Sequence, residues 1–339
     1  MHFTKKNHYN PCFWTAHWNA EFLKAALKGQ RDPARARNQQ VFVLNVKSNK
    51  IYRTSVENVH YDKGMGVAEI TPNAAKDFCK RNFPKEYDRF CEGMKNHPET
   101  VYLDFEDILT GLEATPAYTT LLDVIAKQRI DHPPERGFLA GFVLLHEMRS
   151  HALLNSMVEL HEKAGYYKFE YFWMLKNFLS NTELCYAYVM TFATGYWTFY
   201  SLDRDTFPLN DSPILRAPKS IMVALSPRLL LEIDGTRRAD ESQRTFSNFI
   251  TAEKLNEFRK RTINNTFREI IFGSRSLLEE WQNSTEFANR HKLVADLSSY
   301  NALVRREGRG ELWRINAFGG AAAAADELIE DALGKQTSE

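Results

Sequence analysis

The sequence predicts an α+β fold, in which a mostly helical body with two long packed helices carries a small antiparallel sheet. Apolar residues recur at helical spacing over two long stretches, whereas β-branched and aromatic residues gather in short runs around polar turns. With 339 residues, of which 43% are hydrophobic, the chain can bury a large core without disulfides or a structural metal.

The elements expected in the first third of the chain are short. In order, they are a helix over 21–28, a hairpin formed by 41–46 and 51–54, two helices over 72–95 that are interrupted at Pro84, and a helix over 105–128. The hairpin is predicted because two β-rich runs flank the polar turn at 47–50. The break at Pro84 is predicted because proline has no amide hydrogen and fixes its own φ.

The two long helices are predicted over 135–163 and 169–194. The first begins after Pro133 and Pro134 and ends at Gly165, which are typical start and stop signals. The second is apolar on most of its sides, so it should be central in the molecule. We expect these two helices to pack against each other.

The last third of the chain predicts both strands and helices. The strands are expected at 197–202, 221–225, 229–233 and 270–272, and the helices at 251–269 and 274–291. We expect the hairpin over 41–54 to share one antiparallel sheet with the strands near 197–202 and 221–233. Residues 1–318 would form one domain, or two tightly joined lobes, and residues 319–339 a flexible alanine-rich acidic tail.

Composition excludes several classes of protein. The net charge of +1 argues against a surface that coats polyanions in general, although a local basic groove stays open. The four cysteines are scattered, without zinc-knuckle spacing. Neither a signal peptide nor a membrane-spanning apolar run is present, so we expect a cytoplasmic protein with no membrane partner.

The common catalytic motifs are missing. His146 and His151 are five residues apart, so a helix would turn them away from each other, unlike the four-residue spacing of zinc proteases. There is no phosphate-binding loop and no Gly-x-Ser-x-Gly turn. The basic run at 259–261 is typical of a solvated helix face, and a contact with nucleic acid is its alternative interpretation.

Three polar positions are harder to assign to structure alone. His8 and Tyr9 precede Pro11 in a segment that proline makes stiff, and rigid polar groups suit a binding site. Arg149 lies beside an apolar stripe, and a buried arginine requires a carboxylate or phosphate partner. Asp211 lies in a sharp turn before Pro213, where its carboxylate could serve a site or merely close the bend.

These stretches resemble a bacterial family known only as domain of unknown function 4238, whose members open with His-Tyr-Val-Pro. The resemblance covers residues 5–275. The matching positions are Asn7-His8-Tyr9-x-Pro11, the block from Ile51 to Val59, Glu113, Arg149, Asp211-x-Pro213, Leu225-Ser226-Pro227, Asn256, Asn265 and Ile270-Ile271-Phe272. The chain differs from the family pattern at Asn10, at Leu209-Asn210 and at Ala224.

The resemblance brings no established reaction, but it implies one site formed by His8, Tyr9, Glu113, Arg149 and Asp211. Such a set holds an acid/base group, carboxylates for a divalent metal and a cation for developing negative charge. The first hypothesis is therefore a hydrolase of a phosphate-containing substrate, with nucleic acid as one candidate. His8 would be the base or a ligand, Glu113 and Asp211 metal ligands or bases, and Arg149 the phosphate clamp.

Two alternatives stay open at this point. The same loops could belong to a non-catalytic module that recognises a ligand or partner and regulates it. The shared polar residues could also only join loops to the body, with Arg149 and Asp211 as a buried ion pair.

Overall fold

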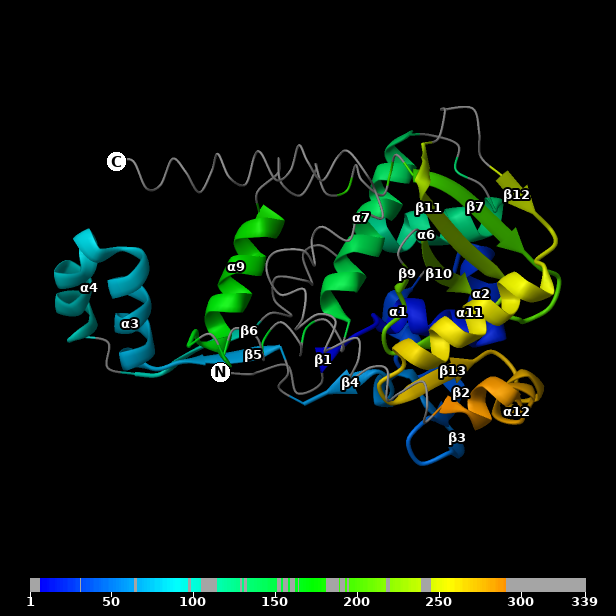
Figure 1. Ribbon diagram of the computed structural model, residues 1–339, viewed down its shortest axis with the longest axis horizontal. Coiled ribbons are helices and arrows are strands. Elements are labelled where there is room, and N and C mark those ends of the chain that lie inside the picture. The colour runs from blue at the N-terminus through cyan, green and yellow to red at the C-terminus, as the bar shows by residue number, and fades with distance from the viewer. Residues whose placement is uncertain are drawn as a thin grey trace.

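The computed structural model describes residues 7–290 except for a set of short gaps. The gaps are residues 31, 64–65, 97–98, 105–114, 129, 131–132, 151–153, 155–157, 159–161, 164, 181–188, 190–192, 194, 218–219 and 239–244. Glu113 and the tail predicted over 319–339 therefore lie outside the described residues. Helices and largely antiparallel sheets together give an α+β architecture (Figure 1).

The elements follow one another along the whole described chain. The helices are α1 (Cys12–Thr15), α2 (Ala20–Leu27), α3 (Pro72–Asn82), α4 (Tyr87–Met94), α6 (Thr115–Lys127), α7 (Pro133–Arg149), α9 (Lys168–Ser180), α11 (Ala252–Asn265), α12 (Arg275–Gln282) and α13 (Thr285–Ala288). The strands are β1 (Asn7–His8), β2 (Gln40–Asn45), β3 (Lys50–Ser55), β4 (Tyr61–Asp62), β5 (Val67–Ile70), β6 (Val101–Asp104), β7 (Gly195–Ser201), β8 (Leu209–Asn210), β9 (Leu215–Ala217), β10 (Ser220–Ser226), β11 (Leu229–Arg238), β12 (Thr245–Ser247) and β13 (Glu269–Phe272).

The larger sheet has five strands in the order β12-β7-β11-β10-β9. Strand β10 is buried along its whole length, as its apolar sequence requires, whereas buried and half-buried residues alternate along β7. The turn at 226–227 joins β10 to β11 in the predicted antiparallel pair. One pairing is parallel, because β12 runs beside β7 in the same direction.

The second sheet has four strands in the order β3-β2-β13-β8. The predicted hairpin is confirmed as β2 and β3, and the predicted strand near 270 is confirmed as β13. β13 pairs with β8 through Ile270 opposite Asn210. This pairing fixes the position of the loop that carries Asp211.

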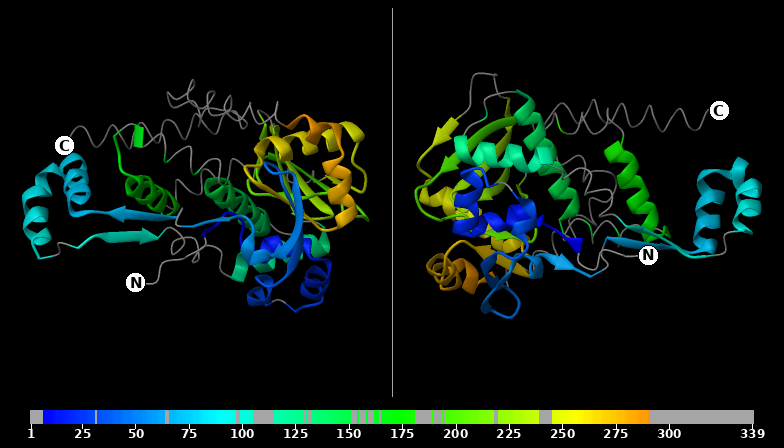
Figure 2. Two further views of the ribbon diagram at one scale, coloured as in Figure 1. Left: turned by 90° about the horizontal axis from the view of Figure 1, so that it is seen from below. Right: turned by 180° about the vertical axis from the view of Figure 1, so that it is seen from behind.

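A smaller part of the molecule lies apart from these sheets. β5 and β6 form a two-stranded ribbon, and beyond it α3 and α4 lie at one end of the molecule (Figures 1 and 2). The predicted pair of helices interrupted at Pro84 is confirmed by α3 and α4. Thr71 caps α3 by accepting a hydrogen bond from the Ala74 amide, and Pro72 occupies the first turn, where proline costs no hydrogen bond.

The prediction of two long packed helices is wrong. α7 ends at Arg149, and the chain bends at Ser150 instead of continuing the helix to residue 163. The helix predicted over 169–194 corresponds to α9, which ends at Ser180. Serine can bond its own backbone and so ends helices without a proline or glycine to mark the break. Among the described residues, no pair of long helices dominates the fold.

The expected single sheet and the last helix also need correction. The hairpin over 41–54 belongs to the four-stranded sheet, whereas the strands near 197–202 and 221–233 belong to the five-stranded one. The helix predicted over 274–291 is divided into α12 and α13, because Ser284 caps the second helix by accepting a hydrogen bond from the Phe287 amide.

Aromatic side chains fill the core. The largest fully buried side chains are Trp14, Trp18, Trp197, Trp281, Tyr9, Tyr118, Phe172, Phe199, Phe207 and Phe258. The high aromatic content of the chain therefore serves packing for the most part. In the part of the chain that the structure describes, no helix is long and apolar enough to cross a membrane.

Candidate functional site

The N-terminal motif is held in place by β4. His8 pairs with Tyr61, and the Tyr9 amide donates to the His60 carbonyl at 2.7 Å. The Nδ1 atom of His8 lies 3.2 Å from the Val59 carbonyl, so Nδ1 carries the proton and Nε2 is the acceptor. The stiffness predicted from Pro11 is thus reinforced by a strand pairing with residues 50 positions away.

Tyr9 is buried, with 1% of its surface exposed. Its ring therefore anchors the segment, and its phenol does not face solvent. The predicted role of Tyr9 as a reacting group would require a rearrangement of the core around it.

Arg149 lies in the last turn of α7 and is only 3% exposed. Burial lowers the pKa of His8 to about 3, and the positive charge of Arg149 is the second cause. The structure therefore brings His8 and Arg149, which are 141 positions apart, within electrostatic reach of each other. Both imidazole nitrogens of His8 are available to a ligand as a neutral donor and acceptor pair at physiological pH.

His146 is a further member of this centre. It is fully buried against Phe142 and Trp14, with ring centroids 4.2 and 5.1 Å away, and neither of its ring nitrogens makes a hydrogen bond. Burial and then Arg149 hold its pKa well below the ordinary value, and the nearby Tyr9 carbonyl opposes this shift without forming a regular hydrogen bond. The sequence showed only the spacing of three from Arg149, which we interpreted as a local polar pair. We name His8, His146 and Arg149 the histidine–arginine centre.

His60 connects this centre to the rest of the fold. Its backbone adopts a φ of 51°, which side chains other than glycine rarely take. Its amide donates to the Glu269 carboxylate at 3.1 Å, its Nε2 to the Glu269 carbonyl at 3.2 Å, and its Nδ1 accepts from the Asn10 amide at 2.8 Å. These contacts hold the unusual backbone conformation. Sequence reasoning missed His60, and no local pattern marks it.

Asp211 is an anchor between two segments. It is buried, and its carboxylate accepts hydrogen bonds from the amides of Phe267, Arg268 and Glu269 at 2.8, 2.6 and 3.0 Å. Three of its roughly four lone-pair positions are therefore occupied by backbone. Asp211 raises the pKa of His60, although burial is the larger cause and lowers it to about 4. Its carboxylate is close to His60 and is directed at the 267–269 backbone.

Metal binding has no support from the described residues. Within the described ranges, no three His, Cys, Asp or Glu side chains lie close enough to hold a metal ion. Glu113, the other predicted metal ligand, lies outside these ranges. A divalent metal at this site therefore stays a prediction from the resemblance alone.

Two departures from the family pattern meet in space. The Asn10 amide group donates to His60 Nδ1 and also to the Asn210 carbonyl at 2.8 Å. The Asn210 side chain in turn donates to the Thr262 carbonyl at 3.2 Å. A valine in place of Asn10 could make neither of the first two bonds, so Asn10 and Asn210 form a local polar link that belongs to this chain.

The basic run at 259–261 is engaged within the protein. Arg259 donates to Glu280 at 2.8 Å, and Arg261 donates to Glu257 one helical turn away. These two guanidinium groups are partly neutralised, which makes a contact of this run with nucleic acid less favourable.

Comparisons of the chain with protein-family models, with curated proteins and with solved structures found no match. The family resemblance therefore stays a prediction. The assignment of the centre depends on the geometry described above.

The anchoring role of Asp211 predicts a loss of stability. Replacing Asp211 with alanine removes three charge-assisted hydrogen bonds and leaves three amides near residue 268 without partners. We expect the free energy of unfolding in urea to fall by about 3 kcal/mol or more. Asp211→Asn keeps one acceptor oxygen and should lose less. Equal stability of wild type and Asp211→Ala would contradict the anchor.

The buried histidines predict that acid destabilises the fold. Burial lowers the pKa of His17 and of His60 to about 4, against 6.5 in an unfolded chain. Between these values the unfolded chain binds protons that the native protein does not. Stability should be complete above pH 6.5 and fall toward pH 4, by up to about 1.4 kcal/mol per pH unit for each histidine. Urea unfolding at several pH values measures this slope.

The matched variant is His17→Gln, which removes one titrating group from the interior. The slope between pH 6.5 and pH 4 should become shallower in this variant. An unchanged slope would show that His17 is not kept neutral in the native state.

Proposed function

We propose that the histidine–arginine centre binds a phosphate-bearing ligand and that the protein hydrolyses a phosphoester there. The observation that carries this proposal is the sign of the local charge. Every described charge that shifts the pKa of His8 is a cation, namely Arg149, Arg37 and His60, and each lowers it. A site whose charged neighbours disfavour an extra proton favours a bound anion.

The residue types fit phosphate in particular. The planar guanidinium of Arg149 offers donors in a fixed fork that matches two phosphate oxygens. The neutral rings of His8 and His146 each add one donor and one acceptor. Because His8 is partly exposed whereas His146 and Arg149 are buried, a ligand would approach from the side of His8.

A bound phosphate would also change the protonation of the histidines. Its negative charge would oppose the effect of Arg149 and raise the pKa of His8 toward its ordinary value. His8 would then take a proton from an attacking water, and Arg149 would stabilise the charge that develops on the phosphate oxygens. This proposal gives no metal-binding role to Asp211, whose oxygens already accept three backbone amides.

The alternative is a non-catalytic module that binds the same kind of anion and regulates a partner. The depth of the site favours this alternative, because Tyr9, His146 and Arg149 are all buried. Binding without turnover would identify it.

Anion binding predicts thermal stabilisation by inorganic phosphate. At a phosphate concentration about ten times the dissociation constant, the native state gains roughly 1.4 kcal/mol, so the Tm should rise. Arg149→Gln should abolish the phosphate-dependent part of the shift, whatever its own Tm. His8→Asn, at a partly exposed position, provides a second variant in case the first folds poorly.

The control for both variants is Arg275→Gln, which changes an exposed arginine whose partner is Glu279. It should retain the full response to phosphate. If the wild-type Tm does not respond to phosphate at all, or if Arg149→Gln responds like the control, the centre is not an anion site.

Hydrolysis predicts a specific kinetic effect at His8. With bis(p-nitrophenyl) phosphate and with short DNA and RNA strands as substrates, His8→Asn should lower kcat by about 100-fold to 10,000-fold while KM changes little. The oligonucleotides test whether nucleic acid is the substrate class. Phosphate binding together with no turnover of any of the three substrates would reject hydrolysis in favour of the regulatory module.

A further inference from the structure

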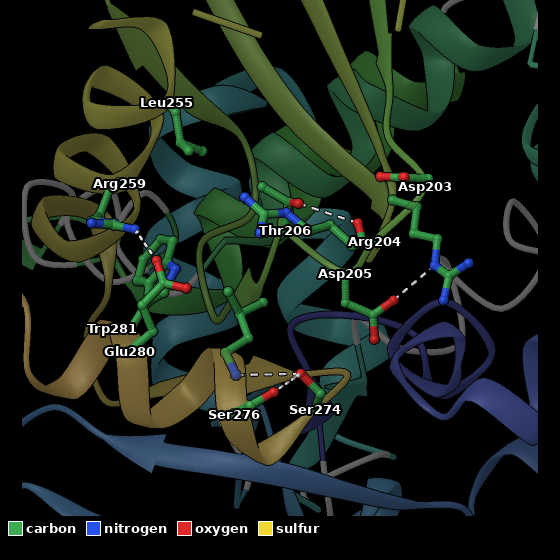
Figure 3. A pocket seen from close by; sticks show the side chains of 12 residues that line it. Asp203, Arg204, Asp205, Thr206, Leu255, Arg259, Ser274, Ser276, Glu280 and Trp281 are labelled. Atoms are coloured by element: carbon green, nitrogen blue, oxygen red, sulfur yellow. Dashed lines mark hydrogen bonds and ion pairs between the residues drawn. The ribbon is translucent and has the colours of Figure 1, made fainter. Parts of the chain in front are cut away.

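A pocket on another face of the protein has chemistry of its own. It lies between α11, the start of α12 and the loop after β7, and its volume is about 370 Å³. Arg259, Glu280 and Trp281 lie on one side of it, and Asp203 and Asp205 lie on the other (Figure 3). None of the residues of the histidine–arginine centre lines it.

Most of the charge in this pocket is neutralised within the protein. Arg228 Nε lies 2.9 Å from the Asp205 carboxylate, on the wall formed by the loop after β7. Arg259 lies 2.8 Å from the Glu280 carboxylate, on the wall formed by the helices. These two ion pairs leave no net charge on either wall.

Two lining charges are left over. Asp203 and Arg204 are both exposed, and among the described residues neither side chain makes a hydrogen bond or an ion pair. They are neighbours in the chain and line the same pocket. The pocket therefore presents one unneutralised anion and one unneutralised cation to whatever enters it.

The remaining walls supply apolar surface and amide donors. Leu255, Leu277 and Trp281 form the apolar part of the lining. α12 begins here, with Ser274 as its cap, and the first-turn amides of a helix have no partners within that helix. These donors and the helix dipole favour a negative group near Ser276.

We propose that this pocket binds a free α-amino acid with an apolar side chain. Its carboxylate would bind Arg204 and the first turn of α12, its ammonium group would bind Asp203, and its side chain would lie against Leu255 and Trp281. A simple anion would face Asp203 without compensation, and a simple cation would face Arg204. A zwitterion satisfies both charges, and the volume leaves room for an aromatic or branched side chain.

The test uses L-phenylalanine and two analogues that each lack one charge. Phenylalaninamide has no carboxylate, and N-acetylphenylalanine has no ammonium group. In calorimetric titrations of the full chain, L-phenylalanine should bind about tenfold more tightly than either analogue, because each charged hydrogen bond contributes that much.

Each variant should erase one of these preferences and keep the other. Arg204→Gln should bind L-phenylalanine and phenylalaninamide equally, and Asp203→Asn should bind L-phenylalanine and N-acetylphenylalanine equally. Both changes are at exposed positions, so the variants should fold. Arg275→Gln, an exposed change on α12 outside the pocket, is the matched control and should keep both preferences. No binding of L-phenylalanine to the wild type, or both preferences intact in both variants, would overturn the proposal.

Discussion

The carboxylate of Asp211 is the contact on which the arrangement of the N-terminal site depends. By accepting three amides from residues 267–269, it joins the loop after β8 to the start of β13. Glu269, the last of these residues, bonds His60 through both its carbonyl and its carboxylate. His60 in turn accepts from Asn10 and, through its carbonyl, from the Tyr9 amide. One chain of hydrogen bonds thus runs from the second sheet to the segment that carries His8.

This chain of contacts has an electrostatic consequence. It is made largely of backbone groups and neutral imidazole, so it holds the segment in place without bringing a carboxylate to His8. The described charges that act on His8 are then cations, and its ring stays neutral. A structural network built on amides, with its one carboxylate fully occupied, is what leaves the centre suited to an anion that comes from outside.

The sequence predicts the local elements of this fold better than their assembly. The hairpin at β2 and β3, the break at Pro84 and the strand β13 follow from runs and turn residues that act over short distances. Which strands share a sheet depends on contacts such as Ile270 with Asn210, 60 positions apart, which no local pattern encodes. His8 and Arg149 could be named because their polar character conflicts with their surroundings in the sequence. His60 could not, because its role depends on Glu269 and Asn10, both distant in the chain.

The most informative wrong prediction concerns α7. A helix continuous to residue 163 would have placed Arg149 in its middle, where the helix dipole has little effect on a charge. Because the chain bends at Ser150, the guanidinium lies in the last turn of α7, at the negative end of the dipole. That position offsets part of the cost of burying a cation beside two imidazoles. The helix end and the site are therefore one feature: the bend at Ser150 makes a buried arginine tolerable in this place, and the arginine keeps His8 and His146 neutral.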